Sequence, residues 1–245
     1  MNSVSAEASK LSMFDLLRCG FPVLGTLFFI AFTPAAFANG EARDDAAVAC
    51  GDAMATTVQA FYETVQNVDA RFTQMTNSVA LGAGSAASNS MTTGRVVFAK
   101  PGKMRWVYEA PQPSLVVSDG ATLWIYDPVS KEAQRFAVTS GYLTGAALSF
   151  LLGEGDLLAE FAVSAKSCDA DVVELRLVPR TDSSYEYLLL NVERSSGEVL
   201  KTSVVDLFGN VTTISFLDAK TNTAPASSIF EFEPPADAQV IDLTP

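Results

Sequence analysis

The sequence predicts a mainly β fold of the α+β class, in which one large antiparallel sheet curls on itself and helices cover its open face. Three observations support this prediction. Short extended segments separated by Gly, Pro and Asp turns fill most of the chain. Only two stretches space their apolar residues as an amphipathic helix does. No internal repeat and no linker interrupts the pattern, so we expect a single domain.

The first series of strands follows residue 70 and has the short, regular spacing of an antiparallel meander. Its predicted strands are 70–75, 94–100, 104–109, 115–118, 122–126 and 133–138. Pairs such as Pro101-Gly102 and Asp119-Gly120 are typical turn residues. The Gly-, Ala- and Ser-rich stretch Leu81–Asn89 is predicted to be a hairpin loop.

A second series of strands occupies the C-terminal half of the chain. Its predicted strands are 161–166, 172–178, 185–193, 199–207 and 211–217, followed by an extended piece over 230–235. Turn residues again separate them, as in Ser195–Gly197 and Phe208–Asn210. The two series together predict that strands far outnumber helices.

Two helices complete the expected elements. The first runs from Ala53 to about Val65 with one apolar face, and the polar residues 39–51 before it are expected to form a loose lead-in. The second lies between Thr139 and Gly153 and has an apolar stripe at helical spacing, made by Leu143, Ala146, Ala147, Phe150 and Leu151. Because no charged residue lies on its other face, we expect this helix to be covered on both sides or to dock loosely.

The N-terminal sequence predicts export. An apolar run over Phe21–Ala38 ends in Ala36-Phe37-Ala38, which is the order of a secretory h-region and its cleavage site. We therefore predict a signal peptide over residues 1–38 and a mature domain over 39–245, with an uncleaved membrane anchor as the alternative. Cys50 and Cys168 then remain in an exported chain, which favours one disulfide over two unpaired thiols.

Composition restricts the possible chemistry. The 245 residues include no histidine, which excludes histidine-based nucleophile activation and histidine metal ligands. The net charge of −12 argues against nucleic acid as a partner, because phosphate binding needs a surplus of Lys and Arg. Acidic residues such as Asp119 and Asp127 fit turns better than a catalytic pair. We expect neither a catalytic set, nor a metal site, nor a cofactor.

Several predicted strands are apolar on both faces. In the predicted strand 122–126, the side chains of Leu123 and Ile125 point to one face and those of Trp124 and Tyr126 point to the other. A sheet with one face in water should alternate more cleanly. Either both faces are covered, as in an ordinary packed core, or one face encloses an apolar cavity, and periodicity alone does not separate the two.

Two hairpins carry a resemblance to a known family. The segments Gly94–Pro111 and Val117–Pro128 resemble the successive hairpins of the outer-membrane lipoprotein carrier protein (LolA) family. Phe72-Thr73-Gln74 and Phe230–Pro235 fit the same family in order and spacing, so the resemblance covers nearly all of the predicted mature chain.

The resemblance implies an incomplete β-barrel with a helical lid over an apolar cavity. It also implies a monomeric periplasmic carrier that takes acylated lipoproteins from an inner-membrane ABC-type transporter to an outer-membrane acceptor. The alternative is an envelope lipid- or protein-binding module on the same fold that does not shuttle. An enzyme is not expected under either reading.

The resemblance also implies roles for individual residues. Lys100 stands where the family has an arginine that hydrogen-bonds lid backbone and favours closure. The acyl chains would contact apolar residues of the first hairpin and of the second predicted helix: Phe98, Met104, Trp106, Leu143, Ala147, Phe150 and Leu151.

Overall fold

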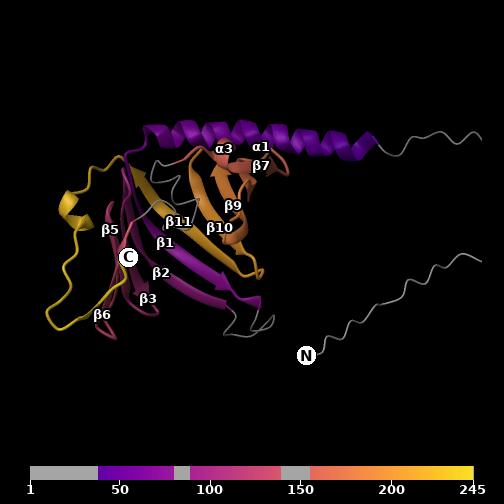
Figure 1. Cartoon of the computed structure of the whole chain (residues 1–245). Coiled ribbons are helices and arrows are strands. Elements are labelled where there is room, and N and C mark those ends of the chain that lie inside the picture. Colours follow the sequence, from indigo (N-terminus) through magenta and orange to yellow (C-terminus); the bar gives the residue numbers. More distant parts are fainter. Residues whose placement is uncertain (1–37, 80–88, 139–154, 245) are drawn as a thin grey trace, which may run out of the picture. The chain divides into compact units, whose positions relative to one another are not determined.

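Twelve strands form one curled sheet (Figure 1). The computed structural model describes residues 38–79, 89–138 and 155–244, which lie in one compact unit, Ala38–Pro245. The strands of the N-terminal half are β1 (Asn67–Asn77), β2 (Asn89–Ala99), β3 (Lys103–Ala110), β4 (Ser114–Asp119), β5 (Thr122–Asp127) and β6 (Glu132–Ala137). Those of the C-terminal half are β7 (Phe161–Ala165), β8 (Val172–Pro179), β9 (Tyr185–Glu193), β10 (Val199–Asp206), β11 (Val211–Thr221) and β12 (Gln239–Asp242).

The spatial order of the strands is β12-β6-β5-β4-β3-β2-β1-β11-β10-β9-β8-β7. All neighbours are antiparallel except β12 and β6, which pair in parallel. The long-range pair β1–β11 joins the two predicted series into one sheet. Within the described residues, β12 and β7 end the sheet and do not pair with each other. The predicted fold class, one curled and unclosed antiparallel sheet, is confirmed.

The register assigns each side chain to one of two faces. Phe98 lies opposite Met104, and Val96 lies opposite Trp106, so all four point to one side of the sheet, together with Phe72. We call this side the inner face and the opposite side the outer face. Gly94 lies opposite Phe72, and a Cβ there would meet the Val107 carbonyl oxygen and the Phe72 ring. Only glycine allows β3 and the Phe72 ring to approach so closely.

The first helix, α1 (Ala38–Thr64), is longer than the sequence analysis predicted. The expected loose lead-in over 39–51 was wrong, because helix continues through it. Alanine, the strongest helix former, recurs between 46 and 49. Gly51 also packs directly on the backbone of Ser164 in β7, where a Cβ would come within 2.7 Å of the Ser164 Cα. That contact covers the edge strand, whose unpaired backbone would otherwise be exposed.

One face of α1 is buried against the sheet. Met54, Val58 and Tyr62, together with Val65 just after the helix, are each at most 6% exposed and belong to the main hydrophobic core. The strands contribute inner-face residues to the same core, including Phe72, Phe98, Leu175, Leu188 and Leu190. A disulfide between Cys50 and Cys168, with Cα atoms 6.0 Å apart, joins α1 to the segment after β7. The short helix α3 (Leu157–Glu160) begins at Asp156, whose carboxylate accepts from the backbone N–H groups of Leu158 and Ala159.

The outer face of β3–β6 has a cover of its own. The segment between β11 and β12 crosses it and includes the 3₁₀ helix η3 (Ser227–Phe230). Phe230 is 3% exposed, and the Phe232 ring lies 5.7 Å from Trp124 and 5.4 Å from Tyr126 between centroids. Arg105 donates to the Ile229 carbonyl oxygen at 3.0 Å. In this part of the sheet, the two-sided apolar pattern therefore reflects a covered outer face.

Candidate functional site

The inner face carries a continuous aromatic cluster on β1, β2 and β3. The Trp106 ring meets Phe72 at 4.7 Å and Phe98 at 5.5 Å between centroids, both edge to face. Tyr108 stacks on Trp106 at 6.0 Å and donates its hydroxyl to the Gln74 side-chain oxygen at 3.4 Å. Burial raises the pKa of the Tyr108 phenol. This cluster forms a rigid apolar floor.

Three residues that the resemblance assigns to the cavity lie in this floor or beside it. Phe98, Met104 and Trp106 are 1%, 3% and 4% exposed, respectively, so they are buried. Their direct contact with a ligand stays a prediction. The lid residues Leu143, Ala147, Phe150 and Leu151 lie outside the described residues.

Further along the inner face, apolar side chains are only partly buried. They occupy inner positions on β4, β5, β10 and β11 and pack against the edge of the core: Val116, Ile125, Val204, Ile214 and Phe216. The sequence alone does not single out these residues. Alternation in 211–217 places Ile214 and Phe216 on one face, but only the long-range pairing of β1 with β11 shows that this face is the one bearing Phe72. They extend the apolar surface beyond the packed floor.

A narrow crevice separates the C-terminal half of α1 from the inner face. Phe61 and Tyr62 line it from the helix, and the sheet contributes Val68, Phe98, Glu198, Val199, Phe216, Ala219 and Thr221. Its volume is about 10 Å³, which is roughly the space of one water molecule. An acyl chain needs far more room, so α1 must move away from the sheet before a chain can enter at this point.

Polar contacts hold this end of α1. Lys100 Nζ donates to the Tyr62 carbonyl oxygen at 2.6 Å, and the Asn222 side-chain oxygen accepts from the Gln66 backbone N–H at 2.7 Å. The backbone N–H of Val199 donates to the Tyr62 hydroxyl at 3.3 Å. Burial lowers the pKa of Lys100, and the nearby Glu63 carboxylate partly opposes that shift. Hydrogen bonds of this kind contribute modestly and can be exchanged for water, which suits a helix that opens.

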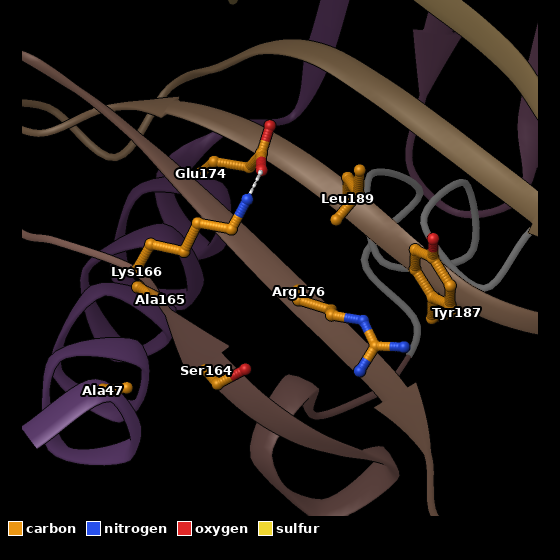
Figure 2. Close-up of a pocket in the computed structure, with 8 residues that line it drawn as sticks. All are labelled: Ala47, Ser164, Ala165, Lys166, Glu174, Arg176, Tyr187 and Leu189. Atoms are coloured by element: carbon orange, nitrogen blue, oxygen red, sulfur yellow. Dashed lines mark ion pairs between the residues drawn. The ribbon is translucent and has the colours of Figure 1, made fainter. Parts of the chain in front are cut away.

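A larger hollow of about 310 Å³ lies on the outer face, beside the N-terminal half of α1 (Figure 2). Its walls are more polar than the crevice. The Arg176 guanidinium lies 4.0 Å from the centroid of the Tyr187 ring, and Lys166 approaches Glu174 at 3.9 Å. Charged side chains in these positions do not favour acyl chains, so the inner face is the better candidate for an apolar ligand.

Residues 38–79, 89–138 and 155–244 contain no helix with the length and apolar character that a membrane span requires. The same ranges hold no group of three or more Cys, Asp or Glu side chains arranged to bind a metal ion.

The chain is similar to members of a known protein family. The profile of the family described as "Outer membrane lipoprotein carrier protein LolA" matches residues 63–233. An outer-membrane lipoprotein carrier protein of Pseudomonas paraeruginosa is 32% identical over 184 residues, covering 72% of this chain and 81% of the relative. A protein of the same name from Bordetella pertussis is 29% identical over 202 residues, covering 81% of this chain and 92% of the relative.

The solved structures that match are more distant than these relatives. A putative outer membrane lipoprotein-sorting protein domain from Vibrio parahaemolyticus has a TM-score of 0.45 and 16% identity, covering 75% of this chain and 97% of its own. A LolA superfamily protein from Nitrosomonas europaea has a TM-score of 0.43 and 14% identity, and the match covers 74% of this chain and 97% of its own. The family profile spans well over half of the chain, and these residues include the aromatic floor, Lys100 and the sheet side of the crevice. The chain therefore belongs to the outer membrane lipoprotein carrier protein (LolA) family, which is a family of carriers and not of enzymes.

Proposed function

We propose that this protein is a periplasmic lipoprotein carrier that binds the acyl chains of its cargo on the inner face of the sheet. The observation that carries the proposal is the apolar inner face, which continues from the packed floor to partly exposed residues such as Ile214 and Phe216. A helix that is partly held by replaceable hydrogen bonds lies over one end of it. Family membership supplies the class of cargo.

The physical need for such a carrier follows from the cost of exposing acyl chains. Each buried CH₂ group contributes about 0.8 kcal/mol, so a lipoprotein with two or more long chains does not leave a membrane for water at a useful rate. A carrier must offer comparable apolar surface and later release it. The closed crevice supports this cycle, because contacts between α1 and the inner face replace those of the ligand when the site is empty.

The proposal also includes how the protein is exported and between which membrane partners it moves its cargo. Residues 1–38 act as a secretory signal, and the mature protein receives cargo from an inner-membrane ABC-type transporter and delivers it to an outer-membrane acceptor. The acidic composition fits this task, since a protein with a net charge of −12 does not adhere to anionic membrane surfaces between transfers.

A release assay tests the proposal. Spheroplasts containing a labelled lipoprotein in the inner membrane are incubated with the purified protein, and the label in the soluble fraction is measured. We expect release in a one-to-one complex. Ile214→Gln on the inner face should reduce release several-fold, whereas Leu217→Gln should not, because Leu217 lies on the outer face of the same strand and is 40% exposed.

Two results would argue against the proposal. If no lipoprotein enters the soluble fraction, the protein is not a carrier for the cargo tested. If a complex forms but never passes its cargo to outer-membrane vesicles, the protein is instead a binding module without shuttling.

A further inference from the structure

One carboxylate interrupts the apolar lining of the crevice under α1. Glu198 lies immediately before β10 in the chain and lines the crevice together with Phe61, Val68, Phe98 and Phe216. Its position is fixed by the preceding turn, because its backbone N–H donates to Ser196 Oγ at 3.1 Å and its carbonyl oxygen accepts from the Glu193 N–H at 2.8 Å. The backbone of Glu198 is thus held next to the surface on which acyl chains are proposed to lie. Burial raises the pKa of the Tyr62 phenol, and the Glu198 carboxylate lies close enough to that group to raise its pKa further.

No described cation neutralises this carboxylate. The ion pairs among the described residues involve other acids, and none includes Glu198. Partial burial raises the pKa of Glu198, and the neighbouring Glu193 raises it further. Glu198 is therefore a half-buried carboxyl group without an ion-pair partner among the described residues.

The geometry points to a ligand that brings its own cation to this position. We propose that Glu198 receives the free α-amino group of a lipid-modified N-terminal cysteine, so that the protein prefers diacylated lipoproteins over those whose α-amino group is acylated. This inference rests on the proposed function and adds to it a preference for one subclass of lipoprotein.

The chemistry of the cargo gives the two forms different charges. A cysteine that carries only a thioether-linked diacylglyceryl group keeps a primary ammonium group close to the start of both chains. Acylation of that nitrogen makes an uncharged amide, which cannot pair with a carboxylate. With the chains on Phe98 and Phe216, an ammonium group at the rim meets Glu198, whereas an amide leaves the carboxylate unpaired.

The test uses three synthetic lipopeptides with the same peptide sequence. The first has a dipalmitoylglyceryl cysteine with a free α-amine, the second is its N-acetyl form, and the third is its N-palmitoyl form. The N-acetyl form isolates the effect of charge, because it has the same two long chains as the first. Dissociation constants are measured for the wild type, for Glu198→Gln and for Glu193→Gln, which removes the same charge from the same turn but does not line the crevice.

We expect N-acetylation to weaken binding to the wild type and to Glu193→Gln about fivefold, which corresponds to a partly exposed ion pair of about 1 kcal/mol. For Glu198→Gln we expect the free-amine and N-acetyl forms to bind equally. Equal binding of these two forms to the wild type would overturn the inference while leaving the carrier function intact. Failure of all three lipopeptides to bind would instead count against the proposed function.

Phosphatidylethanolamine supplies a second comparison, since it also joins two acyl chains to a primary amine. It should compete much less well than the free-amine lipopeptide, because its own phosphate already pairs with the amine. Equal, Glu198-dependent competition by phosphatidylethanolamine would overturn the assignment to lipoproteins.

Discussion

Lys100 connects the turn between β2 and β3 to the C-terminal end of α1 through one hydrogen bond to the Tyr62 carbonyl oxygen. The resemblance predicted that Lys100 would bond lid backbone. In the structure the bonded carbonyl belongs to α1, while the predicted lid residues 143–151 lie outside the described residues. Sequence alone identified the residue but not the helix that it contacts, because that contact joins segments 38 positions apart.

Substitution of Lys100 should change how often α1 opens. Lys100→Met removes the donor, and we expect amide exchange over residues 58–64 to become about tenfold faster, as the loss of a charged hydrogen bond of about 1.5 kcal/mol implies. Lys100→Arg keeps a donor and adds others, so it should slow exchange or leave it unchanged. Hydrogen exchange followed by mass spectrometry measures both. Unchanged exchange in Lys100→Met would show that this bond does not hold α1.

Glu198 should make stability depend on pH in a defined direction. Its pKa is raised in the folded protein, chiefly by burial, so the folded state binds more protons than the unfolded state between the unfolded value of about 4.5 and the raised one. Stability is therefore lost as pH rises through that window. We expect Glu198→Gln to melt above the wild type at pH 7 and to approach it as the pH falls below about 4.5. A variant that melts below the wild type at pH 7 would contradict this account of Glu198.

Among the elements, the strands could be predicted well from local sequence and the covering segments could not. Turn residues such as Asp119-Gly120 mark strand ends locally, so most observed strands begin and end close to the predicted ones. The exceptions are β2, which begins at residue 89 instead of 94, β11, which continues to residue 221 instead of 217, and β12, which was not predicted. The cover of the outer face depends on Phe230 and Phe232 meeting β4 and β5, which are about a hundred residues earlier in the chain. No local pattern encodes that contact. The early part of α1 was missed because its helix depends partly on Gly51 packing against β7.

The C-terminal segment should stabilise the fold without contributing to the ligand site. Phe230→Ala removes a ring that is 3% exposed on the outer side, and we expect a loss of about 3 kcal/mol in the free energy of unfolding. Acyl binding by the molecules that remain folded should be unchanged. Phe208→Ala is the control, because that ring is 82% exposed and its removal should change stability by less than about 0.5 kcal/mol. Denaturant titration gives both values, and loss of acyl affinity in folded Phe230→Ala would contradict the separation of the two faces.

The disulfide should anchor the N-terminal half of α1 to β7. Cys50 and Cys168 close a loop with a sequence separation of 118, for which chain entropy gives up to about 4–5 kcal/mol of stabilisation. We expect the variant with both cysteines replaced by serine to melt well below the wild type, with faster amide exchange in α1 and β7. The intact mass of the purified protein checks the bond itself. Two free thiols in protein recovered from the periplasm would contradict it.

For the molecule as a whole, the sheet has two faces with different tasks. On β3–β6 the outer face is closed by the chain's own C-terminal segment, while the inner face is covered by α1 at one end and continues as partly exposed apolar surface. The sequence showed that some strands were apolar on both sides but could not separate a filled core from a ligand site. The structure accounts for the outer side of these strands, and we propose that the ligand binds on the inner one.

Photo-crosslinking at two adjacent positions tests this assignment most directly. Benzoylphenylalanine is placed at Phe216 on the inner face or at Leu217 on the outer face, and cells that express a labelled lipoprotein are irradiated. We expect the Phe216 position to form a covalent adduct with the lipoprotein through its acyl chains, and the Leu217 position to form none. Adducts at Leu217 with none at Phe216 would contradict the central claim that cargo binds on the inner face.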